Sequence, residues 1–303
     1  MGVVDTRRLP HLVEFARHGS MRVVADVLGT STSVVSQQIA ALAREVGTAL
    51  VEPDGRRSRL TPAGRRLADH ARTILADVET ARLDLDPDAE PRGTVRVAGF
   101  ATAIRRALLP TVEALARTHP QVRLTIREYE PAEAHAMLVA DQIDLALTYD
   151  YDLAPAVLDP DLTATSLWST SWGLAVPAAE VAPEGYENAL AVVDAFRGQP
   201  WIGNSRNQAD EQVLRTLASM AGFHRHMTHE ADSLELVEDL VLAGLGVGLL
   251  PADRAVRPGI SVVPLASPGV RMRAYAVIRR GQSAWPPLTL VLGQVAASRL
   301  RAP

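Results

Sequence analysis

Residues 20–64 read SMRVVADVLGTSTSVVSQQIAALAREVGTALVEPDGRRSRLTPAG and predict two short helices followed by a basic turn. The first helix ends at Gly29-Thr30, and the second begins at Ser31, which can act as its N-cap. The apolar residues spaced as on one helix face are Val24, Ala25 and Leu28 in the first helix, and Val34, Val35, Ile39, Leu42 and Val46 in the second. This arrangement indicates a helix-turn-helix.

The other face of the second helix carries small polar side chains. They are Thr32, Ser33, Ser36 and Gln37. A recognition helix meets base edges with its N-terminal residues, where Gln can pair with adenine and a hydroxyl suits any base. We therefore predict base contacts for these four residues. Taken alone, they suit equally well the capped start of an ordinary amphipathic helix.

The segment 53–61, PDGRRSRLT, is a turn that carries three arginines and suits a hairpin wing lying along DNA phosphates. Residues 1–72 contain 11 Arg against 7 Asp and Glu, whereas the rest of the chain carries a net charge of −8. A basic head on an acidic body fits one end facing nucleic acid, although a solvated charge run is the alternative. The predicted phosphate contacts are Arg22, Arg56, Arg57, Arg59 and Thr61.

The stretch from Leu9 to Ala71 resembles the N-terminal domain of LysR-type transcriptional regulators. The family's pattern is matched in order and without a gap by Phe15, Gly19-Ser20, Ala25, Leu28, Ser31, Ser36, Gln38-Ile39, Leu42, Gly47, Leu50, Leu60-Thr61 and Gly64. Departures are Val24 for a second Ala, Ala43 for Glu, and Val51 and Pro53 for Phe and Arg. The resemblance implies a winged helix-turn-helix that binds operator DNA and regulates transcription.

The next segment has apolar residues spaced 4, 3, 4, 3 and 4 apart, as in the seam of a two-helix coiled coil. They are Leu67, Ala71, Ile74, Val78, Ala81 and Leu85. A core face is the alternative, but the intervening residues are polar and no other helix is near in sequence, so we predict dimerisation. The family resemblance implies the same role, with dimers pairing into a homotetramer through the second domain. A dimer would bind two half-sites about one helical turn or a multiple apart.

The linker helix must end within DPDAEPRG, residues 86–93, because two prolines and a glycine prevent its continuation. Strand and helix patterns then alternate, which predicts an α/β domain of two lobes. The resulting domains are a winged helix-turn-helix (1–62), a linker helix (63–86), a hinge (87–93) and an effector-binding domain (94–303). The expected strands are 94–98, 122–129, 143–148, 172–176 and 247–250, and the expected helices are 104–118, 132–140, 209–222 and 234–243.

The resemblance further implies a periplasmic-binding-protein-like fold, with subdomain I at 94–163 and 269–303 and subdomain II at 164–268. A small-molecule effector should bind between them, where parallel strands end. The candidate effector-binding residues are Phe100, Ala101, Thr102, Thr148, Gly203 and Asn204. Each hydroxyl could equally serve as a helix cap. The loop at 100–102 suits an anion, whereas the acidic run Tyr149-Asp150-Tyr151-Asp152 disfavours one.

Other classes of function find little support. The chain has no cysteine and no G-x-S-x-G or H-E-x-x-H motif, so we expect neither an enzyme nor a cofactor beyond the effector. His224, His226 and His229 would lie on two faces of a strand, so we expect surface histidines and no metal. The absence of a long apolar run or secretion signal predicts a cytoplasmic protein without membrane contact.

We therefore expect a LysR-type, effector-responsive transcriptional regulator, with RNA polymerase as a further candidate partner. The alternative is a small-molecule binding protein or an enzyme whose N-terminal helices serve only oligomerisation. Salt dependence of DNA binding would distinguish the two, because several phosphate contacts make binding weaken steeply as salt rises.

Overall fold

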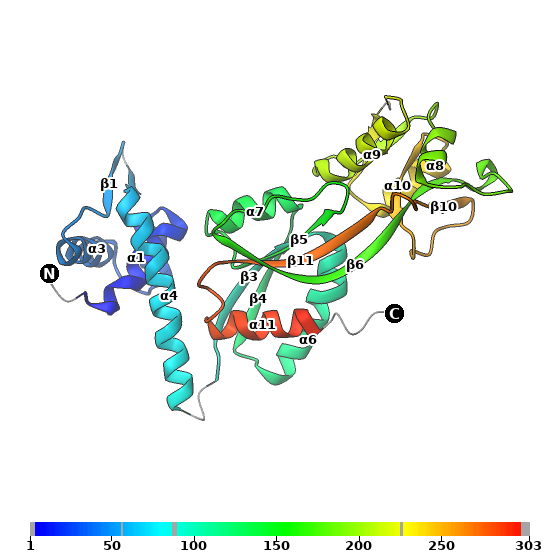
Figure 1. Ribbon diagram of the computed structural model, residues 1–303. Helices are drawn as coiled ribbons and strands as arrows, with labels where there is room; N and C mark the ends of the chain where they lie inside the picture. The colour runs from blue at the N-terminus through cyan, green and yellow to red at the C-terminus, as the bar shows by residue number, and fades with distance from the viewer. Residues whose placement is uncertain (1–3, 56, 87–89, 225–226, 298–303) are drawn as a thin grey trace.

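The computed structural model describes residues 4–55, 57–86, 90–224 and 227–297, in an N-terminal head, a long helix and a two-lobed domain (Figure 1). The head contains a 3₁₀ turn (Thr6–Arg8), α1 (Leu9–His18), α2 (Met21–Val27), α3 (Thr32–Val46) and the hairpin strands β1 (Val51–Asp54) and β2 (Arg57–Leu60). Ser20 and Ser31 cap α2 and α3 with their hydroxyls. Gly47 ends α3 at a φ of 70°, which favours glycine. The helix-turn-helix and its wing form as the sequence predicts.

Helix α4 (Pro62–Leu85) leaves the head directly after the wing. Its N-cap Thr61 accepts a hydrogen bond from Gly64 N at 2.9 Å and donates one to Ala49 O at 2.7 Å. A Cβ at Gly64 would collide with the carbonyl oxygen of Leu50, so only glycine lets the helix pass this close to the chain before the wing. The first turns of α4 thereby belong to the core of the head.

The second domain is built on one mixed sheet with the order β4-β3-β5-β11-β6-β9-β7-β8, and β10 pairs with β6. Its strands are β3 (Gly93–Gly99), β4 (Val122–Glu128), β5 (Leu145–Tyr151), β6 (Leu162–Pro177), β7 (Trp201–Gly203), β8 (Met227–Glu230), β9 (Val247–Pro251), β10 (Ile260–Pro264) and β11 (Arg271–Arg279). Strands β3, β4 and β5 are parallel, as are β7, β8 and β9. These two parallel groups are the centres of two lobes.

The helices surround the two halves of this sheet (Figure 1). Lobe I contains the helical run α5 (Ala101–Ala103), a π-helical turn (Ile104–Leu108) and α6 (Leu109–Thr118), then α7 (Pro131–Val139) and α11 (Pro286–Ala297). Lobe II contains a 3₁₀ turn (Ala178–Glu180), α8 (Ala189–Ala195), α9 (Gln208–Met220) and α10 (Leu234–Leu242).

Two long antiparallel strands depart from the expectation of strand-helix alternation. The first part of β6 pairs with β11, and its last residues pair with β9 and β10, so β6 runs from lobe I into lobe II. The sequence predicted only residues 172–176 of β6 and did not predict β11. The physical reason for the missed part of β6 is that residues 163–166 and 169–171 are small or polar and mostly exposed, so no apolar run marks the strand. The expected boundary after residue 163 falls inside β6.

Candidate functional site

The N-terminal end of α3 presents a polar surface to solvent. Thr32, Ser33, Ser36 and Gln37 are all exposed, whereas Val35 on the opposite face is fully buried. Ser31 Oγ accepts from Val34 N at 3.3 Å and lies 2.8 Å from Ser33 Oγ. The four candidate base-contacting residues therefore share one accessible face.

The wing, which follows α3 in the chain, carries exposed charges. Strands β1 and β2 pair Asp54 with Arg57 next to the turn, and Arg57 is exposed. Arg59 Nη2 lies 2.9 Å from Glu52 Oε1 on the paired strand. Arg22 is exposed on α2. Arg56 lies outside the described residues.

The hydrogen bonds of Thr61 contradict the prediction that it contacts a DNA phosphate. Its side chain is buried, and its hydroxyl donates to Ala49 O and accepts from Gly64 N. Its backbone N–H donates to Leu50 O. Thr61 therefore caps α4 and has no group left to bind a phosphate oxygen.

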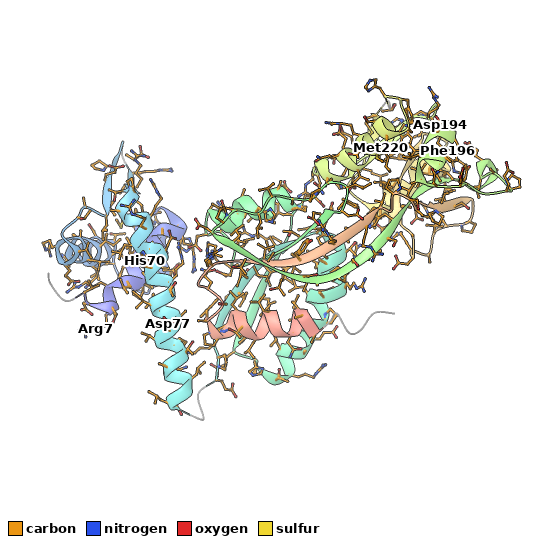
Figure 2. The ribbon with its side chains drawn as sticks, in the orientation of Figure 1. Arg7, His70, Asp77, Asp194, Phe196 and Met220 are labelled. Carbon is orange, nitrogen blue, oxygen red and sulfur yellow. The ribbon has the colours of Figure 1, made fainter. Side chains whose placement is uncertain are left out.

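The expected dimerisation stripe on α4 is buried at one end and exposed at the other. Ala71 is fully buried and Leu67 packs against the core of the head, because α1 covers this end of α4. Among the remaining stripe residues, Ile74 is 38% exposed, Val78 is 56% exposed and Leu85 is 84% exposed. Ala81 is also exposed. Figure 2 labels His70 and Asp77, which mark the level on α4 where the stripe passes from core to solvent.

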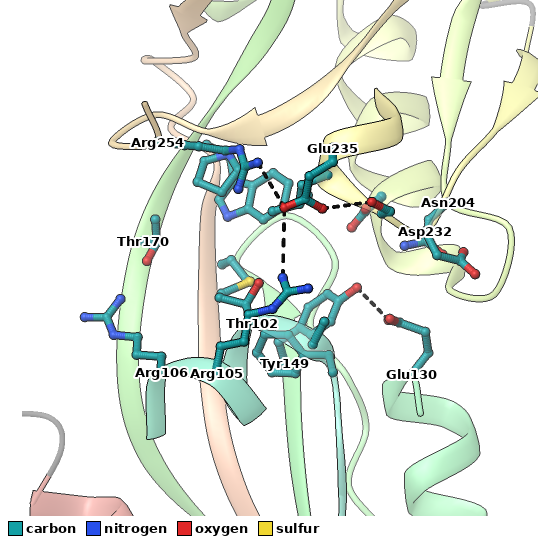
Figure 3. Close-up of a pocket in the computed structure, with 18 of the residues that line it drawn as sticks. Thr102, Arg105, Arg106, Glu130, Tyr149, Thr170, Asn204, Asp232, Glu235 and Arg254 are labelled. Atoms are coloured by element: carbon teal, nitrogen blue, oxygen red, sulfur yellow. Dashed lines mark hydrogen bonds and ion pairs between the residues drawn. The ribbon is translucent and has the colours of Figure 1, made fainter. Parts of the chain in front are cut away.

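A cavity of about 390 Å³ lies between the two lobes (Figure 3). Four of the candidate effector residues line it: Phe100, Ala101, Thr102 and Asn204. Thr148 is buried and lines a different cavity, beside His135 and Arg273. Gly203 is absent from the described lining of both cavities, since its backbone pairs within the sheet at β7. The loop after β3 therefore lines the cavity. Near the ends of β5 and β7, the lining residues are Tyr149 and Asn204, each one position after a predicted residue, and Asn204 was itself predicted.

Aromatic side chains form one wall of this cavity. Phe100 and Tyr149 meet edge to face with ring centroids 4.7 Å apart, and the ring of Phe100 lies 6.4 Å from that of Trp168. The guanidinium carbon of Arg106 lies 4.8 Å from the centroid of Trp168. Trp172 is 6% exposed, and its Nε1 has no hydrogen-bond partner in the described part of the chain. The wall thus offers flat apolar surface together with an unpaired N–H donor.

Polar contacts join the lobes across the cavity. Tyr149 Oη of lobe I donates to Glu130 Oε2 at 2.9 Å and accepts from Asn207 Nδ2 of lobe II at 2.6 Å. Arg206 of lobe II lies 2.6 Å from Glu133 of lobe I. Arg105 lies 4.0 Å from Glu235 across the cavity (Figure 3). Sequence reasoning missed these contacts, because each joins segments far apart in the chain without a local motif.

Two carboxyl groups of the lining are held in a poorly solvated environment. Burial raises the pKa of Glu130 to about 7, with nearby Asp210 and Asp232 adding to the shift and Tyr149 opposing it. Burial likewise raises the pKa of Asp210 to about 6, against the effect of Tyr151 and Asn204 beside it. Asp210 Oδ1 is buried and makes no hydrogen bond of good geometry among the described residues, although Tyr151 and Asn204 lie close enough to lower its pKa. The cavity therefore contains a desolvated acidic pole.

A second charged cluster joins the head to lobe I at Asp141, whose side chain is 6% exposed. Arg72 of α4 donates to Asp141 Oδ2 through Nε at 2.9 Å and Nη2 at 2.6 Å. Arg17 of α1 lies 3.9 Å from the same oxygen. Arg96 of β3 and Arg279 of β11 contact Asp141 from within lobe I. Burial acts to raise the pKa of Asp141, but these arginines outweigh burial and hold it below its usual value.

No cluster of three His, Cys, Asp or Glu side chains suited to a metal ion is found in the described residues. His224 and His229 belong to that part of the chain, whereas His226 lies outside it. In the same residues, no helix is both long and apolar enough to cross a membrane.

Comparison with known proteins agrees with this architecture. The family "Bacterial regulatory helix-turn-helix protein, lysR family" matches residues 6–65, and "LysR substrate binding domain" matches residues 88–299. The transcriptional dual regulator GltC of Bacillus subtilis (strain 168) is 29% identical over 282 residues, which cover 91% of each chain. The DNA-binding transcriptional dual regulator OxyR of Escherichia coli (strain K12) is 27% identical over 290 residues, covering 92% of this chain and 90% of OxyR.

Solved structures share the fold. A full-length variant of OxyR from Pseudomonas aeruginosa has a TM-score of 0.71 at 20% identity, and the match covers 99% of this chain and 95% of the OxyR chain. Full-length CbnR complexed with its target DNA has a TM-score of 0.50 at 21% identity, and the match covers 97% of this chain and 99% of the CbnR chain.

A winged helix-turn-helix joined by a long helix to a two-lobed α/β domain defines a DNA-binding transcriptional regulator with an effector-binding domain. The chain belongs to the LysR family of these regulators. Its relatives are transcriptional regulators rather than enzymes, so the comparisons favour the regulator over the alternative of an enzyme or binding protein.

Proposed function

We propose that two copies of this chain read an operator with the exposed N-terminal face of α3. The base-contacting residues are Thr32, Ser33, Ser36 and Gln37, and the phosphate-contacting residues are Arg22, Arg56, Arg57 and Arg59. The observation that carries the proposal is that the four polar side chains of α3 are exposed together while its apolar face is buried in the core of the head. The arginines of the wing lie on the hairpin that follows α3, which suits phosphate contacts flanking the major groove.

The exposed end of the stripe on α4 joins the two copies. Ile74, Val78, Ala81 and Leu85 are accessible to a second α4, whereas Leu67 and Ala71 serve the core of the head. Apolar residues at this spacing would pair along a coiled-coil seam. Two such dimers then form a tetramer through their effector-binding domains, and the assembled regulator contacts RNA polymerase. It works in the cytoplasm, where the operator DNA is.

A small-molecule effector binds the cavity between the lobes. Contacts such as Asn207 to Tyr149 and Arg206 to Glu133 join the lobes beside the cavity. A ligand inserted there therefore changes the orientation of one lobe relative to the other. The effector shifts the population of lobe arrangements only if it binds one of them better. The change reaches the head through Asp141, which contacts Arg17 and Arg72.

DNA binding is tested with purified protein on the intergenic DNA upstream of its own gene. Gel shifts at two salt concentrations with an excess of unrelated competitor DNA measure both specificity and phosphate contacts. We expect a specific complex whose affinity falls steeply with salt, because several phosphate contacts release counterions. A complex that unrelated DNA displaces equally well would contradict the proposal.

A further inference from the structure

The cavity between the lobes has charges of both signs at separate places. Its lining includes the carboxyl groups of Glu130, Asp210 and Asp232, the guanidinium groups of Arg105 and Arg106, the hydroxyl of Thr102 and the aromatic wall. Figure 3 shows Glu130 and Asp232 on the side away from Arg106, and Glu235 between Arg105 and Arg254. We propose that the effector is an amphoteric molecule whose cationic nitrogen binds at Glu130, Asp210 and Asp232 and whose acidic group binds at Arg105, Arg106 and Thr102. This inference rests on the proposed effector site and specifies the chemistry of its ligand.

The protein neutralises the acidic pole only in part. Arg206, which lines the same cavity, lies 2.6 Å from Glu133 and 3.9 Å from Asp232, so its charge is shared with carboxylates at the rim. Asp210 Oδ1 is buried and accepts no hydrogen bond of good geometry within the described part of the chain, although Tyr151 and Asn204 lie beside it. A buried, poorly paired carboxylate is costly, and a ligand ammonium or guanidinium would both neutralise the group and donate to it.

The guanidinium groups of the basic pole have few carboxylate contacts of their own, although Glu128, Glu235 and Asp253 also line the cavity. Arg105 has one ion pair among the described residues, at the long distance of 4.0 Å to Glu235. Arg106 lies over the ring of Trp168 without an ion pair in the described part of the protein. These groups would accept a carboxylate, and Arg is the side chain best suited to bind one through two parallel hydrogen bonds.

The unpaired groups are complementary to a ligand with both a donor and an acceptor. The loop at 100–102 suits an anion, whereas the acidic run at 149–152 disfavours one. These two expectations conflict only if the ligand carries charge of a single sign. A cavity of about 390 Å³ has room for a metabolite of modest size. A purely anionic ligand would leave the acidic pole unpaired and be repelled by it.

Binding of a cation is linked to proton release. Glu130 faces Tyr149, Asp210, Asp232 and Arg206, and Asp210 faces Tyr151, Asn204 and Asp232, so carboxylates dominate the charges around both. A ligand cation favours their ionised forms. The affinity for a cationic probe should therefore rise as the pH increases from about 6 to about 8.

The test uses the full chain and thermal unfolding with five probes at millimolar concentration. L-arginine, L-lysine and putrescine carry cations, whereas succinate and benzoate carry only anions. We expect the cation-bearing probes to raise the melting temperature, the two amphoteric ones most. Asp210→Asn should lower their affinity about tenfold or more, because the ligand cation loses an ionised partner in a poorly solvated site. The exposed Glu184→Gln is the matched control and should change nothing.

Two readouts distinguish ligand binding from a structural role of Asp210. Without ligand, Asp210→Asn should raise the melting temperature, since it removes a desolvated charge, while it weakens binding. Calorimetry at pH 6.5 in buffers of different ionisation enthalpy should show protons released on binding. Stabilisation by the anions alone, or by none of the five probes, would overturn the proposal. An operator gel shift on the same preparation then tests the proposed DNA-binding function independently of the effector chemistry.

Discussion

Glu130 and Asp141 lie at opposite ends of helix α7 (Pro131–Val139) and face two different functional regions. Glu130 precedes the helix and lines the effector cavity, where its carboxylate accepts a hydrogen bond from Tyr149. Asp141 follows the helix and contacts Arg17 and Arg72 of the head. A helix of nine residues is about 14 Å long, so one rigid element spans the distance between cavity and head.

This relationship gives the proposed regulation a physical route. A ligand that moves Glu130 or Glu133 displaces the start of α7, and the helix transmits that displacement to Asp141. The head would then change its orientation relative to lobe I. The route makes Asp141 the residue at which effector binding in the cavity can be separated from control of the orientation of the head.

The variant Asp141→Asn should loosen the head from lobe I. It removes the carboxylate that Arg17, Arg72, Arg96 and Arg279 share, and the buried Arg279, which has no other ion pair among the described residues, is left uncompensated at a cost of several kcal/mol. Hydrogen exchange should therefore speed up in α1 and in the part of α4 around Arg72. Asp144→Asn is the matched control, because Asp144 is similarly buried but bonds Arg96 within lobe I rather than the head. Equal exchange in the two variants would show that Asp141 does not hold the head.

The stability of the ligand-free protein should fall as pH rises because of Glu130 and Asp210. Their folded pKa values of about 7 and about 6 lie above the ordinary 4.5 and 3.8, so protonation favours the folded state. This contribution is fully present below the ordinary values and is lost as pH rises through the folded ones. Melting temperatures at pH 5, 6.5 and 8 should decline less steeply in the double variant Glu130→Gln, Asp210→Asn. An unchanged slope would exclude these two groups as its source.

The exposed end of the α4 stripe should control dimerisation. Val78→Asp places a charge in an apolar seam and should shift the protein towards monomers in sedimentation velocity experiments. Val157→Asp is the matched control, because Val157 is 96% exposed and lies in lobe I rather than on α4. Dimers that persist unchanged in Val78→Asp would mean that the copies associate through another surface.

The arginines of the wing should strengthen binding to all DNA sequences alike. Arg57→Ala should weaken specific and unspecific complexes to a similar extent and reduce the slope of log affinity against log salt by about 0.9. Arg117→Ala removes the same charge from an exposed site on α6 and should leave the slope unchanged. A loss confined to the operator would instead indicate that Arg57 reads bases.

The sequence predicted the head well because its signals are local. The cap Ser31, the break at Gly29-Thr30 and the hydrophobic spacing of α3 all lie within a few residues of the structure that they specify. Thr61 shows the limit of this reasoning, since a hydroxyl that caps a helix and one that binds a phosphate give the same local pattern.

The sequence predicted the cavity at the loop 100–102 and at Asn204, which both follow predicted strands, and nowhere else. Glu130, Asp210 and Arg206 reach the site from the start of α7, from α9 and from the loop before α9, and nothing in their immediate sequence marks them. Ala71 was expected at a dimer seam for a related reason. The helix that covers it, α1, lies more than fifty residues earlier in the chain, so a sequence window around α4 does not contain it.

The central claim is tested most directly by comparing the double variant Ser33→Ala, Gln37→Ala with the wild type for affinity to operator and to unrelated DNA. A good bidentate base contact contributes about 1–3 kcal/mol, so the ratio of the two affinities should fall about tenfold or more while dimerisation and unspecific affinity stay the same. Thr48→Ala, exposed just beyond the other end of α3, should keep the wild-type ratio. An undiminished ratio in the Ser33 and Gln37 variant would contradict the assignment of α3 as the recognition helix.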